Sequence, residues 1–67
     1  MTVEEKVART IKETGMTLAA VSRKTGIEYN KLQPSMKGRR ELRADEYLKL
    51  CFLLGKDPRD LARDTKQ

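Results

Sequence analysis

Residues 17–33 read TLAAVSRKTGIEYNKLQ, and this pattern predicts two short helices joined at a glycine. Thr17 is suited to cap the first helix, at about 18–25, because its hydroxyl can accept from a free backbone N–H in the first turn. Gly26 then ends that helix, since glycine readily adopts the left-handed conformation. In the second helix Leu32 is the expected inward contact, and the remaining side chains form a polar outer face.

The sequence on either side predicts three further helices and contains no strand signal. Near the start, apolar residues recur every four positions, and Thr2 and Glu5 have the spacing of a capping box. Gly15 and Gly55 are the end signals of the first two of these helices, and Asp57 caps the last, short helix. These helices are expected at 3–14, at 44–54 and from Pro58, with Leu61 facing inward. The fold class is therefore all-α, a compact bundle of five short helices.

The length of 67 residues predicts a single domain, residues 1–67 with the last few frayed, that is too short to enclose a deep substrate cavity. There is no histidine, and the single cysteine, Cys51, suits a buried apolar position. We therefore expect no metal, no cofactor and no enzymatic activity. No apolar run could span a bilayer and the first residues do not resemble a signal peptide, so a cytoplasmic location is expected.

The formal net charge of +5 lies in one region, the basic segment, which we define as residues 23–43. Both flanks, residues 1–22 and 44–67, hold equal numbers of acids and bases. The segment itself contains seven bases and two acids. Because Lys and Arg near phosphates release condensed counterions, this distribution favours a polyanionic partner, and nucleic acid is the first hypothesis.

Two short helices joined through a glycine, the second exposing polar side chains beside a basic loop, form a helix-turn-helix. Residues 16–61 resemble the phage repressor and Cro-like family, also described as lambda repressor-like or XRE-type. The matching pieces are Met16-Thr17, Val21-Ser22, Lys24-Thr25-Gly26-Ile27, Lys37-Gly38-Arg39-Arg40, Tyr47 to Leu54 and Gly55-Lys56-Asp57-Pro58. The resemblance implies a helix-turn-helix at about 17–37, and its specificity lies in the combined spacing of these pieces.

The resemblance also implies which side chains meet double-stranded DNA. In this family the third helix enters the major groove and its first residues contact base edges, while the start of the second helix meets the backbone. The residues then expected at bases are Tyr29, Asn30, Lys31 and Gln33. The residues expected at phosphates are Thr17, Lys37, Arg39 and Arg40.

The sequence departs from the family pattern at several positions. Leu18 stands where glutamine often contacts DNA, and Thr25 and Ser35 replace apolar residues, which implies a thinner core under the third helix. Pro34 deletes a hydrogen bond to the carbonyl of Asn30 and costs about 3 kcal/mol inside a helix. We therefore expect either a short or kinked recognition helix, or one turn that ends before a second turn begins at Pro34.

The helix at 44–54 carries more apolar residues than one buried stripe requires, and Leu48 and Phe52 fall at its edges. One reading is that the last helix or the chain end covers Phe52. The other is that Phe52 and Leu48 build a homodimer contact. A twofold dimer would place two recognition helices about 34 Å apart on a pseudo-palindromic operator.

These features favour a sequence-specific transcriptional regulator, a repressor of phage or mobile-element type in a bacterial or phage-infected cell. Its partners would be double-stranded DNA and a second copy of the chain, with no membrane and no small-molecule ligand. The alternative is a protein-interaction module on the same fold, such as an antirepressor, an antitoxin or a replication adaptor. Under this alternative, Leu18 and Pro34 reflect a loss of DNA recognition, and Phe52 lies on a surface that binds a protein partner.

Overall fold

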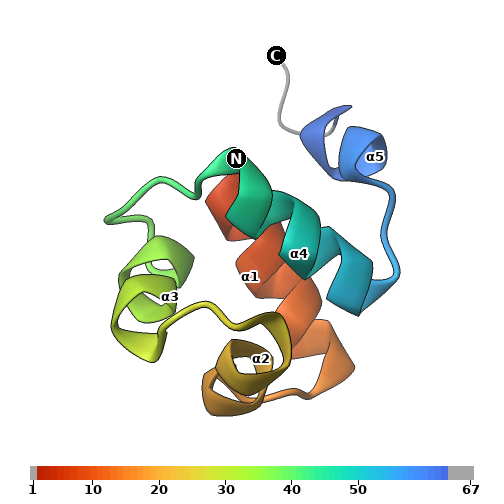
Figure 1. The fold of residues 1–67 in the computed structure, drawn as a ribbon. Helices are drawn as coiled ribbons and strands as arrows, with labels where there is room; N and C mark the ends of the chain where they lie inside the picture. Colours follow the sequence, from red (N-terminus) through yellow and green to blue (C-terminus); the bar gives the residue numbers. More distant parts are fainter. Residues whose placement is uncertain (1, 64–67) are drawn as a thin grey trace.

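Five α-helices follow one another along residues 2–63, the part of the chain that the computed structural model describes (Figure 1). They are α1 (Val3–Thr14), α2 (Leu18–Thr25), α3 (Tyr29–Met36), α4 (Ala44–Leu54) and α5 (Pro58–Arg63). Each lies where the sequence predicts a helix, and no strand occurs in residues 2–63, so the all-α fold class is confirmed. The predicted fraying of the last few residues lies outside the described range. None of these helices is long and apolar enough to cross a bilayer.

Local capping explains why the first two helices begin and end at the predicted residues. The hydroxyl of Thr2 accepts from the backbone N–H of Glu5 at 3.2 Å, and the Glu5 carboxylate accepts from the N–H of Thr2 at 2.8 Å. Thr17 caps α2 by accepting from the N–H of Ala20 at 3.1 Å. Gly26 ends α2 with a φ of 80°, a left-handed conformation that side chains disfavour.

The core lies where α1, α2, α3 and α4 meet. In Figure 1, α1 runs through the middle of the molecule, and α3 and α5 lie at opposite ends of it. Helix α2 packs against α3 and α4, while α1 contacts α3, α4 and α5. The buried apolar side chains are Val7, Ile11, Val21, Ile27, Leu32, Leu50, Cys51 and Leu61. The predicted inward positions of Leu32 and Leu61 and the burial of Cys51 are thus confirmed, and burial raises the pKa of the Cys51 thiol.

Helix α3 is one short helix that continues through Pro34, so the alternative with one turn ending and a second beginning at Pro34 is wrong. Inside the helix, Pro34 lacks the N–H that would reach the carbonyl of Asn30, and its ring crowds that carbonyl. Leu32, two residues before the proline, is fully buried and holds the helix against the core. Packing of Leu32 therefore offsets the local helix-breaking tendency.

The end of α3 is a Schellman motif built around Gly38. The N–H of Gly38 donates to the carbonyl of Ser35 at 3.1 Å, and the N–H of Arg39 donates to the carbonyl of Pro34 at 2.8 Å. Gly38 has a φ of 78°, which is why a glycine is favoured there. The carbonyl of Pro34 thus takes part in ending the helix that its missing N–H weakens.

Polar contacts fill the region under α3 where the sequence predicts a thinner core. The hydroxyl of Thr25 donates to the carbonyl of Val21 at 2.8 Å and accepts from the N–H of Ile27 at 3.3 Å. Ser35 is fully buried, and its hydroxyl donates to the carbonyl of Lys31 at 3.1 Å. Since both hydroxyls have partners, burying them avoids the cost of an unpaired polar group.

Candidate nucleic-acid interface

The turn between α2 and α3 sets the start of the predicted recognition helix. The N–H of Gly26 donates to the carbonyl of Ser22 at 2.9 Å, and the buried side chain of Ile27 fixes the turn against the core. Glu28 is the N-cap residue, with extended backbone and no side-chain capping bond. Its carbonyl accepts from the N–H of Leu32 at 2.8 Å, so the first turn of α3 is regular. The helix-turn-helix predicted for this segment is therefore present.

The structure brings three of the four predicted base-contacting residues together on the first turn of α3. Tyr29, Asn30 and Lys31 are all exposed, with 46% of the Tyr29 surface accessible. The Lys31 ammonium lies 3.9 Å from the carboxylate of Glu28, an exposed ion pair that contributes little to stability. Gln33 lies one turn further and is half-buried, whereas Asn30 is exposed. The first turn thus offers the most available side chains.

The predicted phosphate-contacting residues divide into two groups. Thr17 is exposed at the start of α2, and Lys37 and Arg39 are exposed just after α3. Within residues 2–63 neither Lys37 nor Arg39 forms an ion pair, so both cations remain available to a ligand. At Thr17 the hydroxyl is used for capping, and the helix N-terminus itself is the group suited to an anion.

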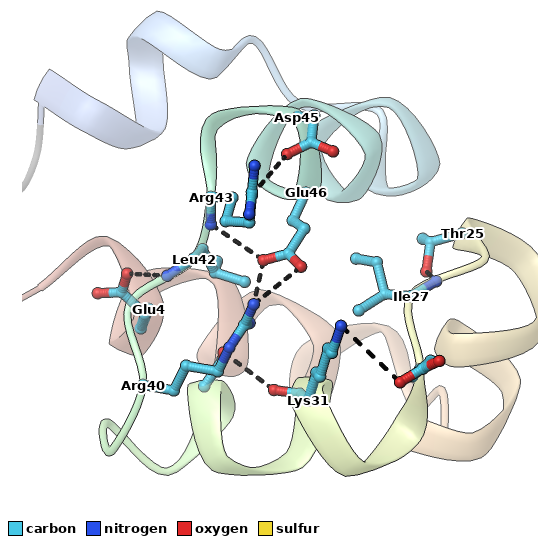
Figure 2. Close-up of polar contacts among 11 residues, drawn as sticks. Glu4, Thr25, Ile27, Lys31, Arg40, Leu42, Arg43, Asp45 and Glu46 are labelled. Carbon is cyan, nitrogen blue, oxygen red and sulfur yellow. Dashed lines mark hydrogen bonds and ion pairs between the residues drawn. The ribbon is translucent and has the colours of Figure 1, made fainter.

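Arg40 differs from the other predicted phosphate contacts because its guanidinium is already engaged inside the protein. Figure 2 shows it pointing toward Glu46 of α4, with a bidentate pair of bonds at 3.0 and 3.1 Å. The same Nη1 donates to the buried hydroxyl of Ser35 at 3.0 Å. Only 28% of the Arg40 side chain is exposed. The guanidinium of Arg40 is thus engaged in contacts within the protein, which the sequence did not indicate.

Two carboxylates that the sequence analysis did not single out hold the loop after α3, which we define as residues 37–43 (Figure 2). Glu46 accepts from the N–H of Arg43 at 2.9 Å, and Glu4 of α1 accepts from the N–H of Leu42 at 2.8 Å. The Arg40 hydrogen bond holds the pKa of Glu46 below its ordinary value, and the N–H of Arg43 acts in the same direction. The same hydrogen bond raises the pKa of Arg40.

Of these contacts, the sequence contains a signal for only one. Glu46 is the third residue of α4, the position from which a glutamate reaches back to the N-cap N–H. Nothing local indicates that Arg40 pairs with Glu46 across the loop, or that Glu4 contacts a residue 38 positions later. Such contacts depend on how separate helices pack.

The residues predicted at a dimer interface are exposed on α4. Phe52 is 92% accessible and Leu48 is 54% accessible, so the described part of α5 does not cover Phe52. Phe52 takes part in lining two hollows of the surface. One is lined by Leu48, Cys51, Lys56 and Pro58, and the other by Lys24, Thr25, Lys49 and Leu53.

Comparison with known families agrees with this architecture. The sequence profile of the Cro/C1-type HTH DNA-binding domain matches residues 6–67, which include the helix-turn-helix and the loop after α3. No curated protein and no solved structure matches the chain. Because the profile covers most of a chain whose two central helices form a helix-turn-helix, the protein belongs to the family of Cro/C1-type helix-turn-helix DNA-binding domains.

Proposed function

We propose that the protein is a sequence-specific transcriptional repressor of phage or mobile-element type that reads the major groove of duplex DNA with α3. The observation that carries this proposal is the first turn of α3. There Tyr29, Asn30 and Lys31 are exposed, while the neighbouring Leu32 is fully buried and fixes the helix to the core. Free side chains on a fixed helix are what direct readout of base edges requires.

Each exposed side chain of the first turn has a chemical preference among base edges. The amide of Asn30 can pair bidentately with adenine, and the ammonium of Lys31 can donate to the acceptors of guanine or to a phosphate. The ring of Tyr29 can contact a thymine methyl or a phosphate. Gln33 follows Asn30 on the same face of the helix and extends the same reading by one turn.

Phosphate contacts would fix the register of α3 on the duplex. We assign them to the N-terminus of α2 at Thr17 and to the exposed cations Lys37 and Arg39, which lie on either side of Gly38. The predicted contact by Arg40 is the least supported of the set, because Glu46 occupies its guanidinium bidentately. In our proposal Arg40 shapes the loop and does not grip the DNA.

A twofold dimer through Phe52 and Leu48 would match a pseudo-palindromic operator. Phe52 is exposed and lines two hollows, so in a twofold contact the Phe52 ring of each copy can enter a hollow of the other. Sedimentation equilibrium of the protein and of Phe52→Ser tests this contact. Dimerisation that is lost in Phe52→Ser would support it, and unchanged association would contradict it.

Selection from a pool of random duplexes, followed by titration of the enriched sequence at several salt concentrations, tests the proposed function. We expect an enriched pseudo-palindrome with half-sites about one helical turn apart and an affinity that falls steeply with salt. Enrichment of no sequence, together with equal affinity for all duplexes, would contradict sequence-specific regulation.

The exposure of Phe52 also favours a second candidate function, a protein-interaction module. Phe52 is 92% accessible and Leu48, one turn earlier on α4, is 54% accessible, and neighbouring exposed apolar side chains can mark a protein-interaction site. In this reading the helix-turn-helix is retained as a scaffold and α4 binds another protein. A stable protein complex that depends on Phe52, formed by a protein without affinity for duplex DNA, would favour this second function over the first.

A further inference from the structure

The loop of residues 37–43 has no regular secondary structure between Gly38 and Arg43, yet hydrogen bonds hold its backbone at both ends. At its start, the N–H of Arg39 is bound to the carbonyl of Pro34 in α3. At its end, the N–H groups of Leu42 and Arg43 are bound to carboxylates of two other helices. The loop is therefore ordered by contacts with α1, α3 and α4 and not by a local turn alone.

Glu46 makes the larger share of these contacts. One of its oxygens accepts from the N–H of Arg43 and from Nη1 of Arg40, and the other accepts from Nη2 of Arg40. Glu46 is only 8% exposed, and Arg40 also donates to the buried Ser35 of α3. A single carboxylate thus ties the first turn of α4 to the middle of the loop and, through Arg40, to the recognition helix.

Glu4 provides an independent attachment from α1. Its Oε2 accepts from the N–H of Leu42 at 2.8 Å, and the two residues are 38 positions apart. Figure 2 shows Glu4 and Glu46 reaching consecutive residues of the chain from different helices. The loop end can therefore move only if both α1 and α4 release it.

We propose that Glu4 and Glu46 are positioning residues of the DNA interface, which hold the loop so that Lys37 and Arg39 face the phosphates. This inference rests on the proposed DNA-binding function. Lys37 and Arg39 keep their side chains exposed, while the backbone that carries them is fixed at both ends. An ordered loop places its cations before DNA arrives, which avoids an ordering cost on binding.

When a carboxylate is removed, this role predicts a change in DNA affinity opposite in direction to the one that simple electrostatics predicts. Glu4 and Glu46 contact the basic segment and reduce the positive potential that attracts DNA, so by electrostatics alone removing either charge should tighten binding to any duplex. If instead the carboxylates position the loop, removing one should weaken binding although the net charge becomes more positive. The direction of the change therefore separates the two accounts.

The experiment compares Glu46→Gln with Asp45→Asn. Both variants remove one negative charge from neighbouring residues of α4, but Asp45 is exposed and has only a 3.8 Å ion pair with Arg43. Binding of a random-sequence duplex is measured at several salt concentrations. We expect Glu46→Gln to weaken binding about tenfold and to reduce the salt slope by about 1 to 2, since contacts of Lys37 and Arg39 are lost. Asp45→Asn should bind as tightly as the parent protein or more tightly.

A second pair of variants tests the same inference at α1. Glu4→Gln keeps a carbonyl oxygen that can accept from the N–H of Leu42, whereas Glu4→Ala leaves that N–H without its partner. We expect Glu4→Ala to weaken binding and Glu4→Gln to restore it. Thermal unfolding of every variant confirms that a folded protein is compared, and the Glu4 pair decides the matter if Glu46→Gln does not fold.

The inference is overturned if folded Glu46→Gln binds as tightly as Asp45→Asn with an unchanged salt slope, or if Glu4→Ala binds like Glu4→Gln. Both results would leave the proposed function standing, because the parent protein still binds duplex DNA. A parent protein that binds no duplex at any salt concentration would instead contradict the proposed function itself. The two failures are therefore distinguishable in one series of titrations.

Discussion

The first turn of α3 and the loop of residues 37–43 belong to the same basic segment, but their side chains are treated differently. In the first turn Asn30 and Lys31 are exposed, and the one ion pair there, with Glu28, is long and exposed. In the loop Arg40 is engaged bidentately by Glu46. Basic side chains of the same segment thus have two uses. Some remain exposed and available to a ligand, whereas Arg40 is used to fix the backbone.

The largest effect should come from the anchor beneath the first turn. Leu32 is fully buried and is the apolar side chain through which α3 packs on the core. We expect Leu32→Ala to lower the free energy of unfolding by about 2–5 kcal/mol, because it leaves a cavity. Urea denaturation followed by circular dichroism measures this change. A loss no larger than that of an exposed control, Leu48→Ala, would mean that α3 is not held by this contact.

The two regions can be compared directly by removing one side chain from each. We expect Asn30→Ala to weaken binding to the selected duplex by about 1–3 kcal/mol while leaving binding to random duplexes unchanged. Lys37→Ala should weaken both kinds of duplex alike and reduce the salt slope by about 1. Titrations at several salt concentrations separate the two patterns. If Asn30→Ala lost equal affinity for both duplexes, the first turn of α3 would not differ from the loop of residues 37–43 in how it contributes to specificity.

Pro34 lies between the two regions, and its replacement tests how much it weakens α3. We expect Pro34→Ala to raise the free energy of unfolding by about 1–2 kcal/mol, because the regained bond to Asn30 outweighs the greater entropy of the unfolded chain. The matched control is Pro58→Ala, since Pro58 begins α5, where no backbone N–H is needed. A gain of the same size in both variants would show that the position of Pro34 inside a helix is not the cause.

The smallest effect concerns the support of the loop and is confined to acid. Because the pKa of Glu46 is lower in the folded protein, its contribution to stability is present above the ordinary glutamate pKa of about 4.3 and is lost as the pH falls through the lower folded value. The difference in unfolding free energy between the parent and Glu46→Gln should therefore shrink as the pH falls below about 4. Urea denaturation between neutral pH and pH 3 measures it. A difference that is independent of pH would show that the charge of Glu46 is not involved.

The bounds of the helices could be predicted because the signals that set them lie within a few residues. Thr2 and Glu5 begin α1, Thr17 and Gly26 bound α2, and Pro58 begins α5. Capping bonds join residues two to four positions apart, so the sequence displays both partners together.

The continuity of α3 and the support of the loop could not be predicted in this way. Propensity at Pro34 indicates a break, but the buried contact of Leu32 outweighs it. The pairing of Arg40 with Glu46 joins a loop to a helix, and the family resemblance, which implies a phosphate contact for Arg40, does not indicate this pairing. The base contacts and the dimer remain predictions, since they depend on partners beyond this chain.

The attachment of Leu42 to Glu4 has a consequence for any attempt to transplant the recognition segment. A graft of residues 28–43 onto another helical scaffold would carry every side chain that we propose at base edges, together with the exposed cations Lys37 and Arg39. It would leave behind Glu4 and Glu46, which come from the first and fourth helices. Such a chimaera would have the side chains proposed to bind DNA but not the hydrogen bonds that hold the loop in place. To restore them, acceptors would have to be engineered at the two equivalent sites of the host.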